Sequence, residues 1–331
     1  MVFYRGPFSD HFDGKKFFNP WGGLPGGGSV LKWLASRKPG SWREWIEDPF
    51  APPPPARVSD GEIRATFVGH STVLIQMDGA NILCDPIWSK RASPFPWMGP
   101  RRHRAPGVGF EELPPIDLVL QSHDHYDHFD VPTLQRIASR WSPVFAVPLG
   151  LRARLSSKRI AADDRMYELD WWQSADAFDK LRITAVPARH FSGRGLRDRN
   201  ATLWCGYMIE GASGAVYFAG DTGYGPHFGE IKGRFPNIRL AFLPIGAYLP
   251  QWFMGPVHVS PEDAVRAHIE LGAATSIAIH FGTFRLADDG EGEPVVDLEC
   301  ALRRTNDPGR GAPRFWVLNP GEGRSVPARV D

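Results

Sequence analysis

The chain has 331 residues, of which 42% are hydrophobic and 23% are charged, as in an ordinary globular protein. Its formal net charge is +1, so there is no overall basic field to attract nucleic acid, and we expect no nucleic-acid partner. The three cysteines form no CxxC pair and no apolar run approaches the roughly 18 residues of a membrane span, so we expect a cytoplasmic protein with at most peripheral membrane contact.

Residues 1–60 are predicted to form an arm that is too small for a core of its own. Ser29 and Ser41 resemble helix N-caps, and the SWRE sequence at 41–44 fits a Ser-x-x-Glu capping box, so we expect two short helices. The prolines at 52–55 predict a stiff, extended spacer. The arm is expected to cap the main domain, residues 61–331, or to contact a second subunit or a membrane surface.

From residue 62 the pattern becomes that of β-strands. The segments 63–77 and 80–84 flank Asp78-Gly79, which favours a tight hairpin turn. The apolar segment 116–120 then leads into a histidine-rich stretch, followed by a predicted helix at 131–141 and a strand at 143–148.

The second half of the chain repeats this theme. A helix with Ser260 as its N-cap is predicted over 260–272. Predicted strands cover 181–190, 202–210, 215–221, 240–248 and 275–282. Strands with interspersed helices in both halves indicate an α/β protein, and the shared theme suggests two similar halves.

The histidine-rich stretch, QSHDHYDHFD at 121–130, predicts metal binding. Neutral imidazole and carboxylate groups suit zinc first, with manganese or iron as alternatives. These residues cannot saturate two ions, but His190, Asp221 and His280 each stand where an apolar strand ends. Because ligands of open α/β folds bind beyond the strand ends, we expect all of them to meet at one edge of a sheet.

The HDHYDH motif at 123–128 and its downstream partners resemble the HxHxDH signature of the metallo-β-lactamase superfamily. This resemblance implies a four-layer αβ/βα sandwich with a dinuclear site between its two sheets. Asp221 would bridge the two ions. The implied ligands are His123, His125 and His190 for the first ion and Asp127, His128 and His280 for the second.

Two of the implied ligand positions differ from those of other branches of the superfamily, and each argues against one activity. His125 replaces the glutamate of diiron flavoproteins, which argues against a redox site. Asp221 stands where antibiotic-hydrolysing members have cysteine, which argues against that activity.

Two aspartates near the motif are predicted to assist the ligands. Asp124 is either a catalytic-site residue that orients water or a histidine, or a solvated capping residue. Asp85 follows the strand 80–84 and is expected to support the ligand loop from behind, unless it serves only to form a turn before Pro86.

A more specific resemblance covers residues 62–285. The segments GHSTVLIQMDG, FAGDTGY, PIGAYLPQWFM and AIHFGTF are similar to the N-acylphosphatidylethanolamine-hydrolysing phospholipase D family and its bacterial relatives. The resemblance implies phosphodiester hydrolysis by a metal-bridged hydroxide. His258 matches a family histidine near the reacting phosphate, so it is expected to bind substrate or to protonate the leaving group; the alternative is a helix-entry residue bonded to backbone.

The substrate is less well specified. The loop at 88–104 combines aromatic residues with Arg101 and Arg102, which are expected to bind a phosphate, although a solvated basic loop has the same composition. The substrate is a phospholipid or another small molecule, and a homodimer is compatible with the arm. Two alternatives remain: a lactonase resembling ascorbate-6-phosphate lactonase, and a noncatalytic metal-binding scaffold.

Overall fold

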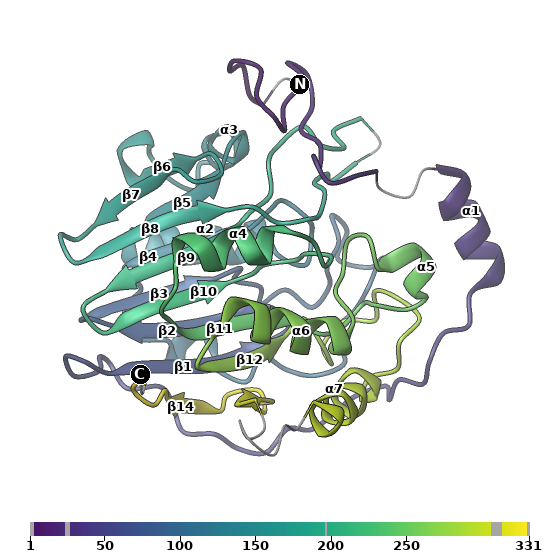
Figure 1. Ribbon diagram of the computed structural model, residues 1–331. Coiled ribbons are helices and arrows are strands. Elements are labelled where there is room, and N and C mark those ends of the chain that lie inside the picture. The colour runs from purple at the N-terminus through teal and green to yellow at the C-terminus, as the bar shows by residue number, and fades with distance from the viewer. Residues whose placement is uncertain (1–2, 24–26, 196, 306–312, 330–331) are drawn as a thin grey trace.

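The computed structural model describes residues 3–23, 27–195, 197–305 and 313–329, and their core is a pair of seven-stranded sheets (Figure 1). The first sheet contains, in spatial order, β14 (Gly323–Ser325), β1 (Ile63–Gly69), β2 (Thr72–Met77), β3 (Ala80–Cys84), β4 (Leu118–Leu120), β5 (Val144–Pro148) and β6 (Met166–Leu169). The second contains β13 (Phe315–Trp316), β12 (Thr275–Ile279), β11 (Ile238–Pro244), β10 (Gly214–Phe218), β9 (Gly206–Gly211), β8 (Leu181–Val186) and β7 (Ser174–Ala177).

Apolar side chains on both faces of the strands hold these sheets between helices. Successive side chains of a strand point to opposite faces. On β3, Ile82 therefore packs in the core between the sheets, whereas Leu83 packs in the outer cluster of α2 and α3. On β11, Phe242 joins the inner core and Ala241 the outer cluster of α4, α6 and α7. The predicted four-layer αβ/βα sandwich is confirmed.

The helices fall into three groups by position. The first sheet is covered by α2 (Val131–Trp141) and α3 (Leu151–Ser157). The second is covered by α4 (His227–Arg234), α6 (Pro261–Leu271) and α7 (Glu293–Arg304), and Figure 1 shows α4 and α6 lying across its face. Two short helices, α1 (Gly27–Ser36) and α5 (Gln251–Met254), contact each other. Among the described residues, no helix is both long and apolar enough to cross a membrane.

Several local predictions are confirmed. Asp78 and Gly79 have φ of 49° and 77°, as the tight turn between antiparallel β2 and β3 requires. The hydroxyl of Ser260 accepts a hydrogen bond from Asp263 N at 3.1 Å, and Gly272 ends α6 with φ of 60°. These signals depend only on neighbouring residues, which explains why they could be read from sequence.

The arm differs from its prediction at both expected helix caps. Ser29 lies inside α1, and no helix begins at Ser41 in the described arm residues. The backbone around Ser41 instead bonds to the 288–291 loop: Gly40 N donates to Asp288 O and Glu291 N donates to Ser41 O. Because tertiary contacts already satisfy these backbone groups, a helical turn gains nothing there.

The arm is packed against the rest of the chain along much of its length. Phe12 and Phe17 are buried in the core cluster between the sheets. After the proline run, the carbonyl groups of Pro55 and Ala56 accept hydrogen bonds from Gln76 and Asn81 on β2 and β3. The predicted spacer is therefore anchored to the first sheet.

Candidate metal centre

The candidate ligands lie where strands of both sheets end. His70 and His123 follow β1 and β4 of the first sheet, and His190, Asp221 and His280 follow β8, β10 and β12 of the second. The two sheets are joined at this edge, since His280 N donates a hydrogen bond to His70 O at 2.7 Å. The site therefore sits at the seam between the sheets, as the family resemblance implied.

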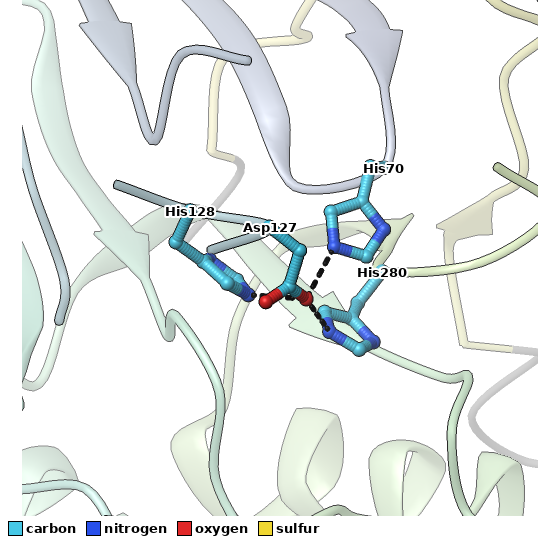
Figure 2. A group of neighbouring side chains, drawn as sticks. All are labelled: His70, Asp127, His128 and His280. Carbon is cyan, nitrogen blue, oxygen red and sulfur yellow. Dashed lines mark hydrogen bonds and ion pairs between the residues drawn. The ribbon is translucent and has the colours of Figure 1, made fainter. Parts of the chain in front are cut away.

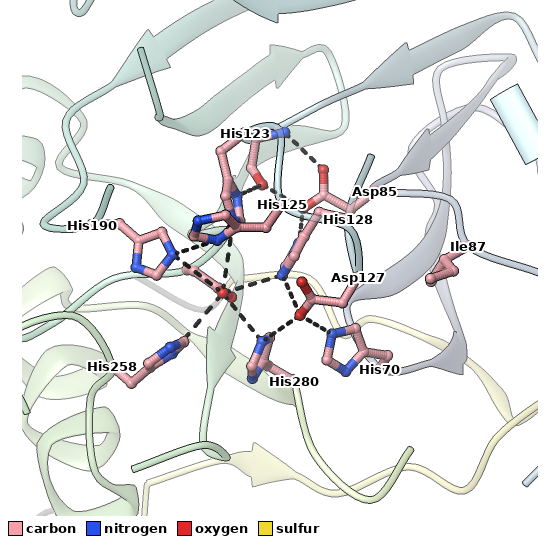
Figure 3. A network of polar contacts seen from close by, with 12 residues as sticks. His70, Asp85, Ile87, His123, His125, Asp127, His128, His190, His258 and His280 are labelled. Atoms are coloured by element: carbon pink, nitrogen blue, oxygen red, sulfur yellow. Dashed lines mark hydrogen bonds and ion pairs between the residues drawn. The ribbon is translucent and has the colours of Figure 1, made fainter. Parts of the chain in front are cut away.

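One group of imidazoles consists of His123, His125 and His190. His125 Nδ1 lies 2.9 Å from His123 Nε2 and 3.2 Å from His190 Nε2. Each residue offers one ligand atom within 4.8 Å of the others. The far nitrogen of His190 donates to the carbonyl of Val257, and that of His123 bonds the hydroxyl of Ser122. These contacts aim the near nitrogens at one point (Figure 3).

A second group brings Asp127 together with three imidazoles. Asp127 Oδ2 lies 3.4 Å from Nε2 of both His128 and His280 and accepts a hydrogen bond from His70 Nε2 at 2.9 Å. Figure 2 shows the carboxylate facing the three rings. The group thus contains the three residues predicted for the second ion, together with His70.

Asp221 lies between the two groups. Its Oδ2 is 3.2 Å from Nε2 of both His128 and His280, 3.7 Å from His190 Nε2 and 3.9 Å from His123 Nε2. His258 approaches the same oxygen, with Nδ1 at 4.0 Å. The carboxylate is therefore placed to be shared by ions in both groups.

Sequence reasoning missed His70. It stands directly after the apolar strand β1, so it carries the same strand-end signal that identified the other ligands. Its φ is 56°, and Asp85 and His280 also have positive φ, of 39° and 60°. A left-handed conformation in residues other than glycine costs about 1–3 kcal/mol and is typical of functional sites. At this seam the left-handed conformation turns the chain sharply after β1, β3 and β12.

Asp85 lies behind the ligands, as expected for a supporting carboxylate. Its Oδ2 accepts a hydrogen bond from His128 Nδ1 at 2.7 Å, and its Oδ1 accepts one from Ser122 N at 2.7 Å. This contact leaves His128 Nε2 free to face Asp221 and Asp127.

Three predicted residues are not brought into the centre. Asp124 accepts a hydrogen bond from Gly193 N at 2.7 Å and pairs with Arg154 at 2.8 Å, so its carboxylate holds a neighbouring loop. The guanidinium of Arg102 is buried and donates to the carbonyls of Ser89 and Ile87, while Arg101 pairs with Glu44 at the surface. Asp124 and Arg102 are thus engaged within the fold, whereas Arg101 forms one surface ion pair.

The charges of the centre are coupled. Burial alone would raise the pKa of Asp221 and Asp127, but the adjacent imidazoles hold both well below the usual range. Burial would lower the pKa of His128 and His280, but the carboxylates raise the former well above its ordinary value and the latter to about 9.

The remaining imidazoles of the centre are held neutral. Burial, together with the neighbouring imidazoles, lowers the pKa of His123 and His190 well below the ordinary value. Burial likewise lowers the pKa of His70 to about 3 and that of His258 to about 4. Without metal, two imidazolium ions therefore balance two carboxylates.

The donor set fits metal cations. Several buried atoms of the centre, among them His128 Nε2, His280 Nε2 and Asp221 Oδ1, form no hydrogen bond with the described residues, although both nitrogens lie 3.2 Å from Asp221 Oδ2 as ion pairs. Leaving such an atom unsatisfied costs about 1–3 kcal/mol, and a coordinated cation removes that cost. Together with the two groups of imidazole and carboxylate ligands, this arrangement is consistent with a dinuclear metal site.

A cavity of about 290 Å³ opens onto the centre. His125, Asp127 and His258 line its polar end. Apart from Arg199, the lining away from the metal centre is apolar and includes Trp33 of α1 and Phe253 of α5, whose rings stack 5.0 Å apart. The arm thus forms part of the wall over the metal centre.

Comparisons with known proteins agree with this geometry. A family model described as the β-lactamase superfamily domain matches residues 80–281. An uncharacterized Mycobacterium tuberculosis protein is 43% identical over 256 residues, 76% of this chain and 68% of that one. The N-acyl-phosphatidylethanolamine-hydrolyzing phospholipase D 1 of Caenorhabditis elegans is 36% identical over 287 residues, 82% of this chain and 81% of its own.

A solved structure extends this agreement to the fold. Igni18, a metallo hydrolase from Ignicoccus hospitalis, superposes with a TM-score of 0.59 at 23% identity, covering 81% of this chain and all (100%) of its own.

Replacing the shared carboxylate tests the assignment of the centre. Asp221→Ala should lose bound metal and abolish activity, because both groups lose a ligand and the buried imidazolium ions lose their counter-charge. The same change at the exposed Asp176, which pairs only with Arg182 at 3.3 Å among the described residues, should leave metal content unchanged. Metal per chain is measured by plasma mass spectrometry, and a full complement in the Asp221 variant would contradict the assignment.

Metal binding should also release protons. His128 and His280 hold protons at pH 7 in the metal-free protein because their pKa values are raised, and a histidine must be neutral to bind metal. We expect roughly one to two protons per chain to be released on loading at pH 7. Metal affinity should then rise with pH through the region of about 9, the pKa of His280. Calorimetric titration in buffers of different ionisation enthalpy measures this release; binding without proton release would refute the charge assignment.

Proposed function

The chain belongs to the metallo-β-lactamase superfamily, and on this premise we propose that it hydrolyses N-acylphosphatidylethanolamine-like phospholipids as a phosphodiesterase of phospholipase D type. Metal-dependent hydrolysis follows from the family and from the paired His/Asp groups. The choice of phospholipid is supported by the cavity, because its lining joins the metal centre and one cation, Arg199, to a set of apolar side chains.

The shape and chemistry of the cavity suit an amphiphile. A phosphodiester would lie beside His125, Asp127 and His258, while acyl chains would pack against Trp33 and Phe253. Apolar surface continues outward on α1 and α5, where Leu31 is 71% and Trp252 is 47% exposed. A sugar lactone would gain little from such walls. The C. elegans relative named for this lipase activity supports the same choice.

We infer which residues hold the two cations. His123, His125 and His190 would bind one, Asp127, His128 and His280 the other, and Asp221 both. Zinc is the first candidate for these ligands. When bound, a pair of divalent cations would acidify a water and neutralise charge on the phosphoryl oxygens.

The chain's own contribution is orientation. Asp85 and the carbonyl of Val257 fix the rings of His128 and His190, and His70 fixes the carboxylate of Asp127. Ligands held by such contacts keep their positions when substrate enters, so little reorganisation accompanies the reaction.

His258 is placed to contact the substrate. It lines the cavity, and its Nδ1 is buried without a hydrogen-bond partner among the described residues. Burial lowers its pKa to about 4, so the ring is neutral at pH 7, and a nearby cation would lower the pKa further. A neutral ring fits hydrogen bonding to the phosphodiester better than delivery of a proton to the leaving group.

Removing this ring should therefore separate turnover from metal binding. His258→Ala should retain both cations but lower kcat by on the order of 10²-fold, the usual effect of losing one hydrogen bond to the transition state. His258→Gln should recover part of the rate, since an amide can still donate. Loss of metal from His258→Ala would instead make His258 a ligand and overturn this role.

Substrate choice is tested directly with the metal-loaded protein. It should convert N-acylphosphatidylethanolamine to phosphatidic acid and N-acylethanolamine, and should also cleave bis(p-nitrophenyl) phosphate. Phe253→Ala should raise KM for the lipid several-fold and leave the small ester unaffected, because only acyl chains use that wall. Phe50→Ala, which changes a side chain that is 89% exposed, is the matched control. Hydrolysis of lactones without cleavage of either phosphodiester would refute the proposal.

A further inference from the structure

A second cavity, of about 590 Å³, lies on the other side of the loop that carries the metal ligands. In this loop, residues 123–130, His125 and Asp127 line the cavity over the metal centre. Tyr126, Phe129 and Asp130 line the second cavity. The two cavities therefore share one wall, but their linings differ in chemistry.

The second cavity is rich in cations. Its lining includes Lys90, Arg91, Arg154, Lys158 and Arg194. Asp130 is the one carboxylate among the described residues of the lining, and it is engaged by the hydroxyls of Ser89 and Thr133 at 2.7 and 2.6 Å. Positive charge thus prevails throughout the cavity.

Two of these cations are already used by the fold. Arg154 pairs with Asp124 at 2.8 Å and with Asp198 at 2.6 Å. Arg194 donates to the carbonyls of Asp124 and Phe129 and stacks on Tyr126, with its guanidinium 3.7 Å from the ring centroid. These contacts fix the shape of the cavity floor.

The other three cations remain available for a ligand. Within the part of the chain that the structure describes, the side chains of Lys90, Arg91 and Lys158 form no ion pair, and the guanidinium of Arg91 donates only to the carbonyl of Gly99. Cations gathered in a concave site without counter-charges attract anions, and lysine and arginine together suit a phosphate group.

The rim of the cavity is apolar and exposed. Phe95 lines the cavity and is 44% exposed, and its ring lies 5.4 Å from that of Trp97. Trp97 is 70% and the adjacent Met98 is 49% exposed. Exposed tryptophan beside lysine and arginine is typical of surfaces that enter a membrane interface. A soluble phosphate compound would not use this rim.

We propose that the second cavity binds the phosphate group of an anionic phospholipid headgroup while Phe95, Trp97 and Met98 enter the lipid interface. Such a site docks the molecule on an anionic membrane and performs no chemistry. It uses none of the residues assigned to the cations, so it stands independently of the proposed reaction.

Vesicle sedimentation with the full-length, metal-loaded chain tests this site. The chain should bind vesicles that contain phosphatidylglycerol and should bind pure phosphatidylcholine vesicles much less. Lys90→Glu with Lys158→Glu should weaken binding to the anionic vesicles by about tenfold or more, since each basic residue near an anionic surface contributes severalfold. Trp97→Ala should weaken binding but keep the preference for anionic lipid.

A matched control carries the same charge change elsewhere. Arg303→Glu with Arg304→Glu alters two exposed residues of α7, which does not line the cavity, and should bind as the wild type does. Unchanged metal content reports that each variant is folded. Lys158→Gln removes one charge at an exposed residue and serves as a milder variant if the double substitution does not fold. Undiminished binding of the Lys90/Lys158 variant, or equal binding to both kinds of vesicle, would overturn the proposal.

Inorganic phosphate distinguishes a soluble ligand from a lipid. The lipid assignment fails if calorimetry shows tight binding of phosphate, if phosphate displaces the chain from vesicles, and if Trp97→Ala leaves the affinity for phosphate unchanged. The site would then serve a soluble phosphate. Weak phosphate binding alongside strong vesicle binding supports the headgroup.

Discussion

The carboxylate of Asp221 is the constraint on which this structure depends. It is buried, and its Oδ2 lies within 4.0 Å of a nitrogen of each of five histidines. A buried charge is tolerated only when it is compensated. In the metal-free chain, protonated His128 and His280 supply that compensation; bound cations would replace those protons. The carboxylate of Asp221 is thus always paired with positive charge, either from imidazolium ions or from bound cations.

The fold supplies the rigidity that this charge arrangement needs. Strands from both sheets end at one seam, where the backbone of His280 bonds directly to that of His70. His70, Asp85 and His280 adopt left-handed backbone conformations there. The large core between the sheets offsets this strain, because the strands that end in these residues are almost wholly buried. Packing far from the seam therefore holds the ligands in place.

Patterns of neighbouring residues carried the reliable sequence predictions: the Asp78-Gly79 turn, the Ser260 cap and the HDHYDH motif. Strand ends marked His190, Asp221 and His280 because a polar residue there interrupts an apolar run. The helix predicted at the SWRE segment and the phosphate-binding role predicted for Arg102 could not be judged from local sequence, because the contacts of these residues come from distant segments. Ser41 bonds to the 288–291 loop, and Arg102 donates to the carbonyls of Ser89 and Ile87. The cavity walls were likewise beyond local patterns, since Trp33 and Phe253 meet only in the fold.

The central claim is that two cations share one carboxylate at the seam. Anomalous diffraction from crystals of the protein as purified, recorded on both sides of the zinc absorption edge, tests it most directly. The account predicts two anomalous peaks per chain, one among His123, His125 and His190 and one among Asp127, His128 and His280, with Asp221 between them. A single peak, or peaks away from Asp221, would contradict it.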